Sequence, residues 1–310
     1  MEQALADFLI SRLLYAAAVL LGVSVAVFFL IRIGGDPSAL FLPPEAPVEE
    51  IERFRRLMGF DRPLAVQYFD FLGRALQGDF GMSLRYDQPA MKLVLERVPA
   101  TLQLGAMALL MSLVISIPLA ILAAAKHGSA IDRASLLASL LGQSFPAFWL
   151  AIMLILLFSE TFRLLPPSGR GTWQQLIMPA IVLATYSTAI ITRLLRSSMI
   201  EVLQSDYVRT ARGKGVKESR IILSHALRNA AIPTLTVIGL QVGALLGGAV
   251  ITEEVFAYPG VGRLAIQAIA NRDFTVVQAF VVLMAALIVT INLLVDLSYG
   301  LLDPRLRKGK

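Results

Sequence analysis

The sequence predicts an all-α protein that crosses a membrane several times. Apolar residues make up 56% of the 310-residue chain, and the mean hydropathy is +0.71. Soluble domains contain roughly 45–50% apolar residues and about 25% charged residues, whereas only 16% of this chain is charged. The apolar residues are gathered in runs of about 20, the length at which a helix crosses about 30 Å of hydrocarbon.

Six apolar segments have this length, and each is predicted to be a transmembrane helix. They are Leu13–Ile31, Thr101–Ala125, Ser135–Phe158, Leu176–Leu195, Ile232–Thr252 and Gln278–Leu301. The first is interpreted as a retained span, because it is longer than the apolar part of a signal peptide and lacks a small-residue cleavage pattern. Pro118 and Pro146 lie inside two spans, where neighbouring helices can satisfy the backbone groups that a proline leaves free.

The distribution of lysine and arginine predicts the side of the membrane that each short loop faces. One set of loops and tails holds Arg12, Lys126, Arg133, Arg193, Arg196, Arg209, Arg212, Lys214, Lys217, Arg220, Arg228, Arg305, Arg307, Lys308 and Lys310. The opposite short loops hold only Arg163, Arg170, Arg263 and Arg272. Cytoplasmic loops carry the excess of basic residues. Both termini and the loop after the fourth span are therefore expected in the cytoplasm.

The long segment between the first two spans is expected to form a folded helical cap outside the membrane. Apolar residues over Val48–Met58 are spaced for one face of a helix, and Val66–Leu76 is expected to be a second helix. The expected organisation is a first span with its cap at residues 1–97, a five-helix core at 98–304 with a cytoplasmic loop at 197–230, and a cytoplasmic tail at 305–310.

The loop between the fourth and fifth spans is predicted to be ordered. A first helix is expected to run as far as Arg212, where Gly213 and Gly215 supply the backbone freedom that ends it. A second helix over Val216–Asn229 then returns to the membrane. The alternative is a purely topological loop at the lipid headgroups. Nucleic-acid binding is disfavoured, because Tyr207 is the only aromatic residue of this loop and the expected membrane topology explains its positive charge.

Four short motifs, each present once, are informative together and in their order along the chain. They are Asp206–Gly215 with His225–Pro233 in the cytoplasmic loop, Gly78–Ser83 with Arg97–Thr101 before the second span, Glu254–Gly262 in the last external loop, and Asp303–Arg305. Together they resemble the permeases of binding-protein-dependent ABC importers, in form closest to the dipeptide/oligopeptide branch. The cytoplasmic loop is similar to the family's "EAA" loop, but Arg209 replaces its Glu and Thr210 replaces its first Ala.

The resemblance implies a permease subunit that forms half of a translocation pathway for peptides or related solutes, such as glutathione, nickel complexes or oligosaccharides. The implied partners are a second homologous permease, two cytoplasmic ATPase subunits, an external solute-binding protein and the lipid bilayer of a bacterial inner membrane. ATP and magnesium belong to the ATPase subunits in such systems. This chain lacks the phosphate-binding motif, since Gly215 follows Lys214 where a Ser or Thr is needed. We therefore expect no enzyme activity, cofactor, metal or nucleic-acid partner of its own.

The resemblance also implies that the cytoplasmic loop forms a coupling helix docked in a groove of an ATPase subunit. Small side chains suit such a contact, and polar side chains suit its rim. The expected contact residues are Asp206, Tyr207, Arg209, Thr210, Ala211, Lys214 and Gly215. The last external loop is expected either to reach toward the binding protein with exposed aromatic tips, or to pack as a re-entrant turn on the pore mouth. Its candidate residues are Glu254, Phe256, Tyr258, Pro259 and Gly260.

Glycines and polar residues inside the spans are the remaining candidates. Gly239, Gly243 and Gly247 share one helix face and suit close packing, either within the chain or against a partner permease. Pore lining is expected for Gln143, Gln241 and Asn292, and helix-to-helix hydrogen bonds are the alternative for the two glutamines. The competing class is a secondary transporter or channel, but the inverted repeats and midplane ionisable residues common there are not seen.

Overall fold

The computed structural model describes residues 2–33, 47–57, 59–83 and 85–302. These residues form helices and one isolated β-bridge, between Met82 and Pro89. Five helices in this part of the chain are long and apolar enough to cross a membrane, and a sharply bent helix pair provides a sixth crossing if it counts as one span. The predicted all-α, multi-span class is confirmed. The expected tail at 305–310 and the start of the expected cap, residues 34–46, lie outside the described residues.

The chain divides into two compact units, each described here by itself. One unit contains residues 1–99 and 264–310, and the other contains residues 100–263. The boundaries fall inside two helices, α5 (Ala90–Ala125) and α12 (Val261–Ala270).

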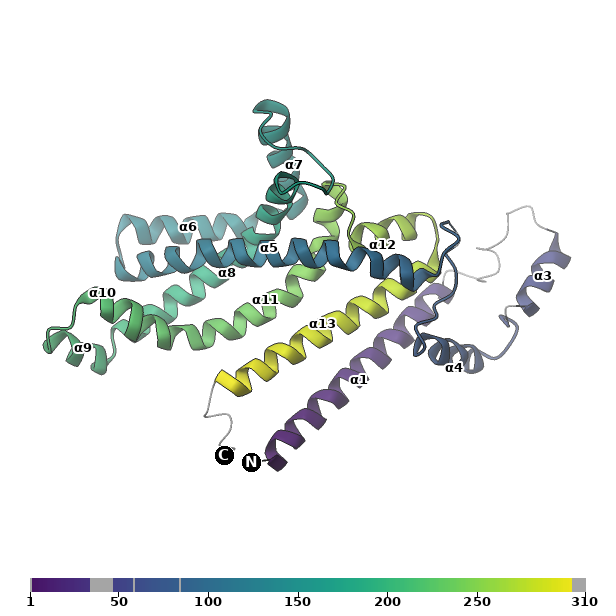
Figure 1. Ribbon diagram of the computed structural model, residues 1–310, viewed down its shortest axis with the longest axis horizontal. Coiled ribbons are helices and arrows are strands. Elements are labelled where there is room, and N and C mark those ends of the chain that lie inside the picture. Colours follow the sequence, from purple (N-terminus) through teal and green to yellow (C-terminus); the bar gives the residue numbers. More distant parts are fainter. Residues whose placement is uncertain (1, 34–46, 58, 84, 303–310) are drawn as a thin grey trace. The chain divides into compact units, whose positions relative to one another are not determined.

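In the first unit, α1 (Glu2–Ile33) packs along α13 (Phe274–Leu302), as Figure 1 shows. The two short helices α3 (Val48–Leu57) and α4 (Leu64–Ala75) follow α1, which confirms the two predicted cap helices over their described residues. Contact between α4 and α1 is polar and aromatic. The hydroxyls of Ser24 and Tyr68 lie 2.9 Å apart, and the Phe28 ring contacts the rings of Tyr68 and Phe71.

The Gly78–Ser83 motif forms a tight connection that is tied to the start of α13. Gly78 and Gly81 have φ angles of +78° and +89°, which side chains other than hydrogen rarely allow. The backbone N–H of Gly81 donates to the Asp79 carboxylate at 2.9 Å. The Ser83 hydroxyl donates to the buried carboxylate of Asp273 at 2.5 Å. The motif is therefore explained by backbone geometry and one buried hydrogen bond.

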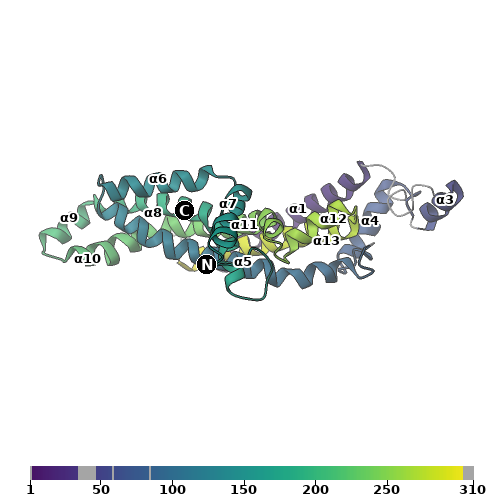
Figure 2. The same cartoon turned by 90° about the horizontal axis from the view of Figure 1, so that it is seen from above.

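The second unit contains the greater part of α5 and a series of packed helices. These are α6 (Ala130–Ser144), α7 (Ala147–Leu154), the π-helical segment η1 (Ile155–Thr161), α8 (Gln174–Leu203), α9 (Asp206–Gly213), α10 (Glu218–Arg220), the π-helical segment η2 (Ile221–Ala226) and α11 (Leu227–Val255). The closest packing is between α8 and α11, and α6 also packs against α8. In both views α9 and α10 lie together at one end of this unit (Figure 1, Figure 2).

The third predicted span is broken, contrary to the expected continuous helix over Ser135–Phe158. Helix α6 ends at Ser144, and the chain bends by 102° before α7 and η1 (Figure 1). Phe145 has extended backbone angles, φ −81° and ψ 128°, and Pro146 has no N–H to continue the helix. By contrast, Pro118, Pro179 and Pro233 lie inside continuous helices.

The predicted helix over Val216–Asn229 is also not a separate element. From Glu218 to Val255 the chain forms one helical run of 38 residues, made of α10, η2 and α11. The return from the loop to the membrane is thus continuous with the fifth span. The start of this run is therefore joined to the fifth span by helix and not by a linker.

Candidate functional site

The first candidate region is the α9 turn, which we define as residues 204–218. Ser205 adopts an extended conformation and begins α9, with Asp206 in the first turn and Arg212 in the last. These charges match the polarity of the helix ends. Gly215 has a φ angle of +75°, and its N–H donates to the carbonyl of Arg212 at 2.9 Å. The predicted helix end is therefore confirmed, and Gly215 supplies the left-handed residue that reverses the chain.

Helix α9 is fastened to its neighbours on both sides. The Val208 side chain is fully buried. The Asn229 amide donates to the Tyr207 hydroxyl oxygen at 2.7 Å. Arg212 donates two hydrogen bonds to the Glu218 carboxylate, at 3.1 and 2.7 Å, and this pairing raises the pKa of the Arg212 guanidinium. Because of these contacts, α9 is an ordered surface and not a flexible loop.

The structure brings the seven predicted contact residues onto α9 and the residues that follow it. Asp206 and Arg209 form an ion pair of 3.3 Å, with side chains 93% and 78% exposed. Thr210, Lys214 and Gly215 are exposed, and Ala211 is half-buried. Tyr207 differs from Asp206, Arg209 and Thr210, which bond within α9, because its hydroxyl accepts a hydrogen bond from Asn229 of α11. Sequence reasoning did not identify Val208 and Asn229 as the residues that hold this surface.

The second candidate region is the Glu253 turn, which we define as residues 253–263, at the other end of the helical run. Glu253 itself is completely buried. Its carboxylate accepts hydrogen bonds from the Thr101 hydroxyl at 2.5 Å and from the backbone N–H groups of Gly262 at 2.7 Å and Arg263 at 3.1 Å. Sequence reasoning named the neighbouring Glu254 and missed Glu253. The available signal was an acidic residue at the end of an apolar span, followed by closely spaced glycines.

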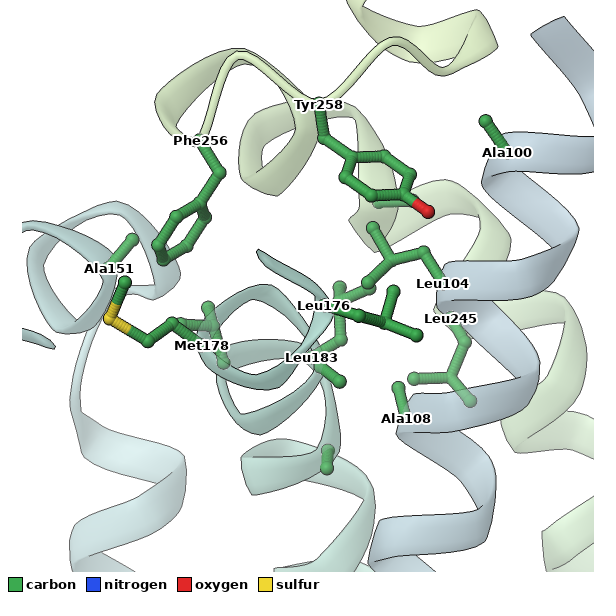
Figure 3. Close-up of a cluster of buried hydrophobic side chains, with 14 residues drawn as sticks. Ala100, Leu104, Ala108, Ala151, Leu176, Met178, Leu183, Leu245, Phe256 and Tyr258 are labelled. Atoms are coloured by element: carbon green, nitrogen blue, oxygen red, sulfur yellow. The ribbon is translucent and has the colours of Figure 1, made fainter. Parts of the chain in front are cut away.

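One expectation was that the two aromatic residues of this turn are exposed tips. The structure shows that this expectation was wrong. Phe256 and Tyr258 are each only 1% exposed. They belong to a core cluster with Leu104 and Met178, shown in Figure 3. Burial raises the pKa of the Tyr258 phenol. The physical reason is that both rings find apolar neighbours on α5, α7 and α8 of their own chain, as the alternative of a packed turn requires.

The other candidates of this turn are divided between surface and interior. Glu254 is exposed and lies 3.9 Å from the guanidinium of Arg263. Pro259 is half-buried and Gly260 is buried. The polar part of the turn that reaches the surface is therefore small.

The candidates inside the spans have different surroundings. Gln241 is buried and accepts a hydrogen bond from the Ser187 hydroxyl at 3.0 Å, which joins α11 to α8. Gln143 is half-buried and Asn292 is exposed. Along the glycine face, burial decreases from Gly239, which is buried, through Gly243 to Gly247, which is exposed and has nothing within 4 Å of an added Cβ. Only the first part of this face is thus occupied by the chain's own packing.

A buried ion pair that sequence reasoning missed joins α6 to α8. Asp132 accepts hydrogen bonds from Arg196 Nε and from Arg196 Nη2, the latter at 2.8 Å. The N–H of Gly128 and the ring of His127 also approach this carboxylate, at 2.9 and 3.0 Å. Ser129 begins α6, and its hydroxyl accepts from the Asp132 N–H. The Ser–x–x–Asp spacing was the signal that predicts such a helix start.

Two family models together cover nearly the whole chain. Residues 116–308 match the binding-protein-dependent transport system inner membrane component, and residues 5–105 match the N-terminal part of such membrane components. The dipeptide transport system permease protein of Escherichia coli K12 is 39% identical over 98% of this chain and 99% of its own length. The glutathione transport system permease protein of the same strain is also 39% identical, over 97% of this chain and 99% of its own length.

A solved structure shares the fold. The inward-facing MetNI methionine ABC transporter contains a chain that superposes with a TM-score of 0.59 at 19% identity, covering 69% of this chain and 97% of that chain. The family models and the near full-length relatives confirm the family that the sequence resembles, and the solved structure agrees with the helical architecture. The chain belongs to the family of binding-protein-dependent transport system inner membrane components.

Proposed function

We propose that this chain is the permease subunit of an ATP-driven importer for short peptides, and forms half of its translocation pathway. The observation that carries this proposal is the similarity to the dipeptide and glutathione permeases over almost the full length of all three chains. Dipeptides and glutathione are both short, polar peptides with free carboxylates. The chain is equally similar to both permeases. This similarity supports short peptides as the substrate class, and it does not favour dipeptides over glutathione.

The proposed site of energy coupling is the α9 turn. It presents exposed polar side chains on a helix that is joined to α11 by the hydrogen bond between Tyr207 and Asn229, and Val208 of the same helix is buried. A docked partner can therefore push on α11 without first ordering a loop. The excess of basic residues around α9 supports a cytoplasmic position for it and for both termini. The Glu253 turn is then on the external side, where the binding protein delivers substrate.

The proposed assembly contains a second, homologous permease, two cytoplasmic ATPase subunits and an external solute-binding protein. ATP and magnesium bind to the ATPase subunits, and this chain contributes no catalytic group. Its contribution to the cycle is to bind the ATPase differently in two conformations, because only a difference in binding free energy shifts a conformational equilibrium.

Transport is tested with the assembled importer in proteoliposomes. The expected result is uptake of a labelled dipeptide that requires both enclosed ATP and external binding protein. Unlabelled glutathione or a second dipeptide should reduce this uptake if the binding protein accepts it. Uptake that proceeds without ATP or without the binding protein contradicts the proposal and supports a channel or a secondary transporter.

Orientation is tested separately with single cysteines, since the natural chain has none. Gln204 and Gln88 are both exposed, and they lie on opposite sides in the proposed topology. An impermeant thiol reagent added outside intact cells should label a cysteine at Gln88 and spare one at Gln204. Labelling of both positions from outside refutes the proposed topology.

A further inference from the structure

The Glu253 carboxylate is the best candidate for a functional group outside the α9 turn. It is completely buried, and its hydrogen-bond donors are the Thr101 hydroxyl and two backbone N–H groups. We propose that Glu253 is a positioning residue for transport, which with Thr101 locks the Glu253 turn to the end of α11. This inference rests on the proposed function of the chain.

The hydrogen bonds of Glu253 join three helices at one point. Glu253 belongs to α11, Thr101 belongs to α5, and the two backbone donors lie in the first turn of α12. Thr101 closes the arrangement, because its hydroxyl oxygen also accepts the N–H of Val261 at 2.9 Å. The carboxylate thus provides acceptors for backbone donors at the start of α12, where a negative charge is favoured by the helix dipole.

The glycines of the turn leave room for this carboxylate. A Cβ added to Gly260 would collide with the Glu253 carboxylate, and one added to Gly262 would lie 2.5 Å from the Cα of Val250 and 3.0 Å from Glu253 Oε2. Any side chain at Gly260 therefore displaces the carboxylate from its donors. Gly260 is therefore explained by the approach of a buried acid to the backbone, and Gly262 by the approach of both Val250 and this acid.

The position of Glu253 connects it to the proposed coupling site. The helical run of 38 residues from Glu218 to Val255 begins at the α9 turn and reaches the Glu253 turn. At 1.5 Å per residue this run is about 57 Å long. A movement that starts at α9 therefore arrives at Glu253 through continuous helix. It is passed on to the start of α12 where α11 is attached to it, and the Glu253 carboxylate contributes to that attachment by accepting the N–H groups of Gly262 and Arg263.

The test uses the assembled importer in lipid nanodiscs, with Glu253→Gln and Thr101→Val as separate variants. Glu253→Gln removes the charge and one acceptor at nearly constant volume, and Thr101→Val removes the hydroxyl. Glu254→Gln is the matched control, because it makes the same charge change on the adjacent exposed residue. Thr101→Ser is the conservative variant that keeps the hydroxyl.

Three quantities are measured: basal ATP hydrolysis, its stimulation by peptide-loaded binding protein, and hydrogen exchange of the amides at 256–263. In Glu253→Gln and Thr101→Val we expect unchanged basal hydrolysis, faster exchange in the turn, and a loss of about tenfold in stimulated hydrolysis and uptake, as for one buried hydrogen bond to a charged group. Glu254→Gln and Thr101→Ser should behave like the natural protein.

Two results overturn the inference. If exchange and stimulation are both unchanged in Glu253→Gln and Thr101→Val, Glu253 does not hold the turn. If exchange accelerates while stimulation and uptake stay normal, the lock exists but has no part in transport. Neither result touches the proposed function, which fails only if the natural importer takes up peptide without ATP or binding protein. Should Glu253→Gln fail to assemble, Thr101→Val decides, because it leaves the carboxylate in place.

Discussion

The two turns at the ends of the 218–255 helical run are both rich in glycine, yet they are built in opposite ways. In the α9 turn the charged side chains that form ion pairs are exposed, and nothing lies within 4 Å of a Cβ added at Gly215. In the Glu253 turn the carboxylate and both aromatic rings are buried, and added Cβ atoms collide with Glu253 or Val250. The first turn is therefore an exposed polar surface, whereas the second is part of the chain's own core.

This comparison predicts that the two turns fail differently when a glycine is replaced. In the Glu253 turn the fold itself should suffer, because the available space is filled. In the α9 turn the permease should remain folded and lose a partner. The predictions below run from the largest expected effect to the smallest.

Gly262→Ala should have the largest effect on stability. Its Cβ would lie 2.5 Å from the backbone Cα of Val250, which cannot move aside like a flexible side chain. We expect destabilisation of about 1–3 kcal/mol or more from overpacking, measured as a lower thermal midpoint of the purified permease. Gly247→Ala is the control, since nothing lies within 4 Å of its Cβ. Equal midpoints for the two variants would contradict the close contact at Gly262.

Gly215→Val should weaken the ATPase interaction while the permease stays folded. A β-branched residue at a φ angle of +75° is strained by about 1–2 kcal/mol. At 1.4 kcal/mol per tenfold, the loss in affinity for the ATPase subunit is roughly five- to thirtyfold if the turn changes shape. Ala211→Trp should act in the same direction by overpacking the contact.

The measurement for both variants is the amount of ATPase subunit that co-purifies with the permease. The thermal midpoint of the permease alone is the control and should fall less than in Gly262→Ala, because the residues around Gly215 are exposed and leave room for the turn to change shape. Normal co-purification and uptake in both variants would mean that the α9 turn is not the coupling surface.

Tyr207→Phe should have an intermediate effect. It removes the hydroxyl that accepts from Asn229 but keeps the ring, and a hydrogen bond of this kind contributes about 0.5–1.5 kcal/mol. Hydrogen exchange of the α9 amides should increase by up to about tenfold. Asn229→Ala should have a similar effect, and the double variant should be no worse than either, because both changes break the same bond. Additive effects would show that the two residues act separately.

Lys217→Gln should have the smallest effect. Lys217 is exposed at the start of α10, and surface substitutions of this kind usually change stability by less than about 0.5 kcal/mol. ATPase co-purification and uptake should stay within about twofold of the natural protein. A large loss would extend the contact surface beyond α9 to the start of the 218–255 run.

Much of the architecture was predictable because lipid imposes a simple rule on sequence. Long apolar runs such as Leu13–Ile31 form helices in a bilayer, so the length and hydropathy of these runs identified five of the spans. The helix end at Gly215 was also predictable, since backbone freedom at a glycine is a local property. The bend at Pro146 was harder to predict from the sequence. Both Pro146 and Pro118 lie within long apolar runs, yet the helix continues through Pro118 and breaks before Pro146.

The site residues that sequence reasoning missed all depend on distant partners. Glu253 and Glu254 are chemically identical neighbours, and only the arrival of Thr101, 152 residues earlier, makes one a buried acceptor while the other stays at the surface. The same holds for Asp132 with Arg196 and for Tyr207 with Asn229. The sequence by itself determined the membrane class, five of the six predicted spans and the helix end at Gly215, because these follow from local hydropathy and backbone geometry. Which polar side chains are buried, and which aromatic rings enter the core, was decided only by the tertiary structure, because a buried polar group is stable only where the fold brings it a partner.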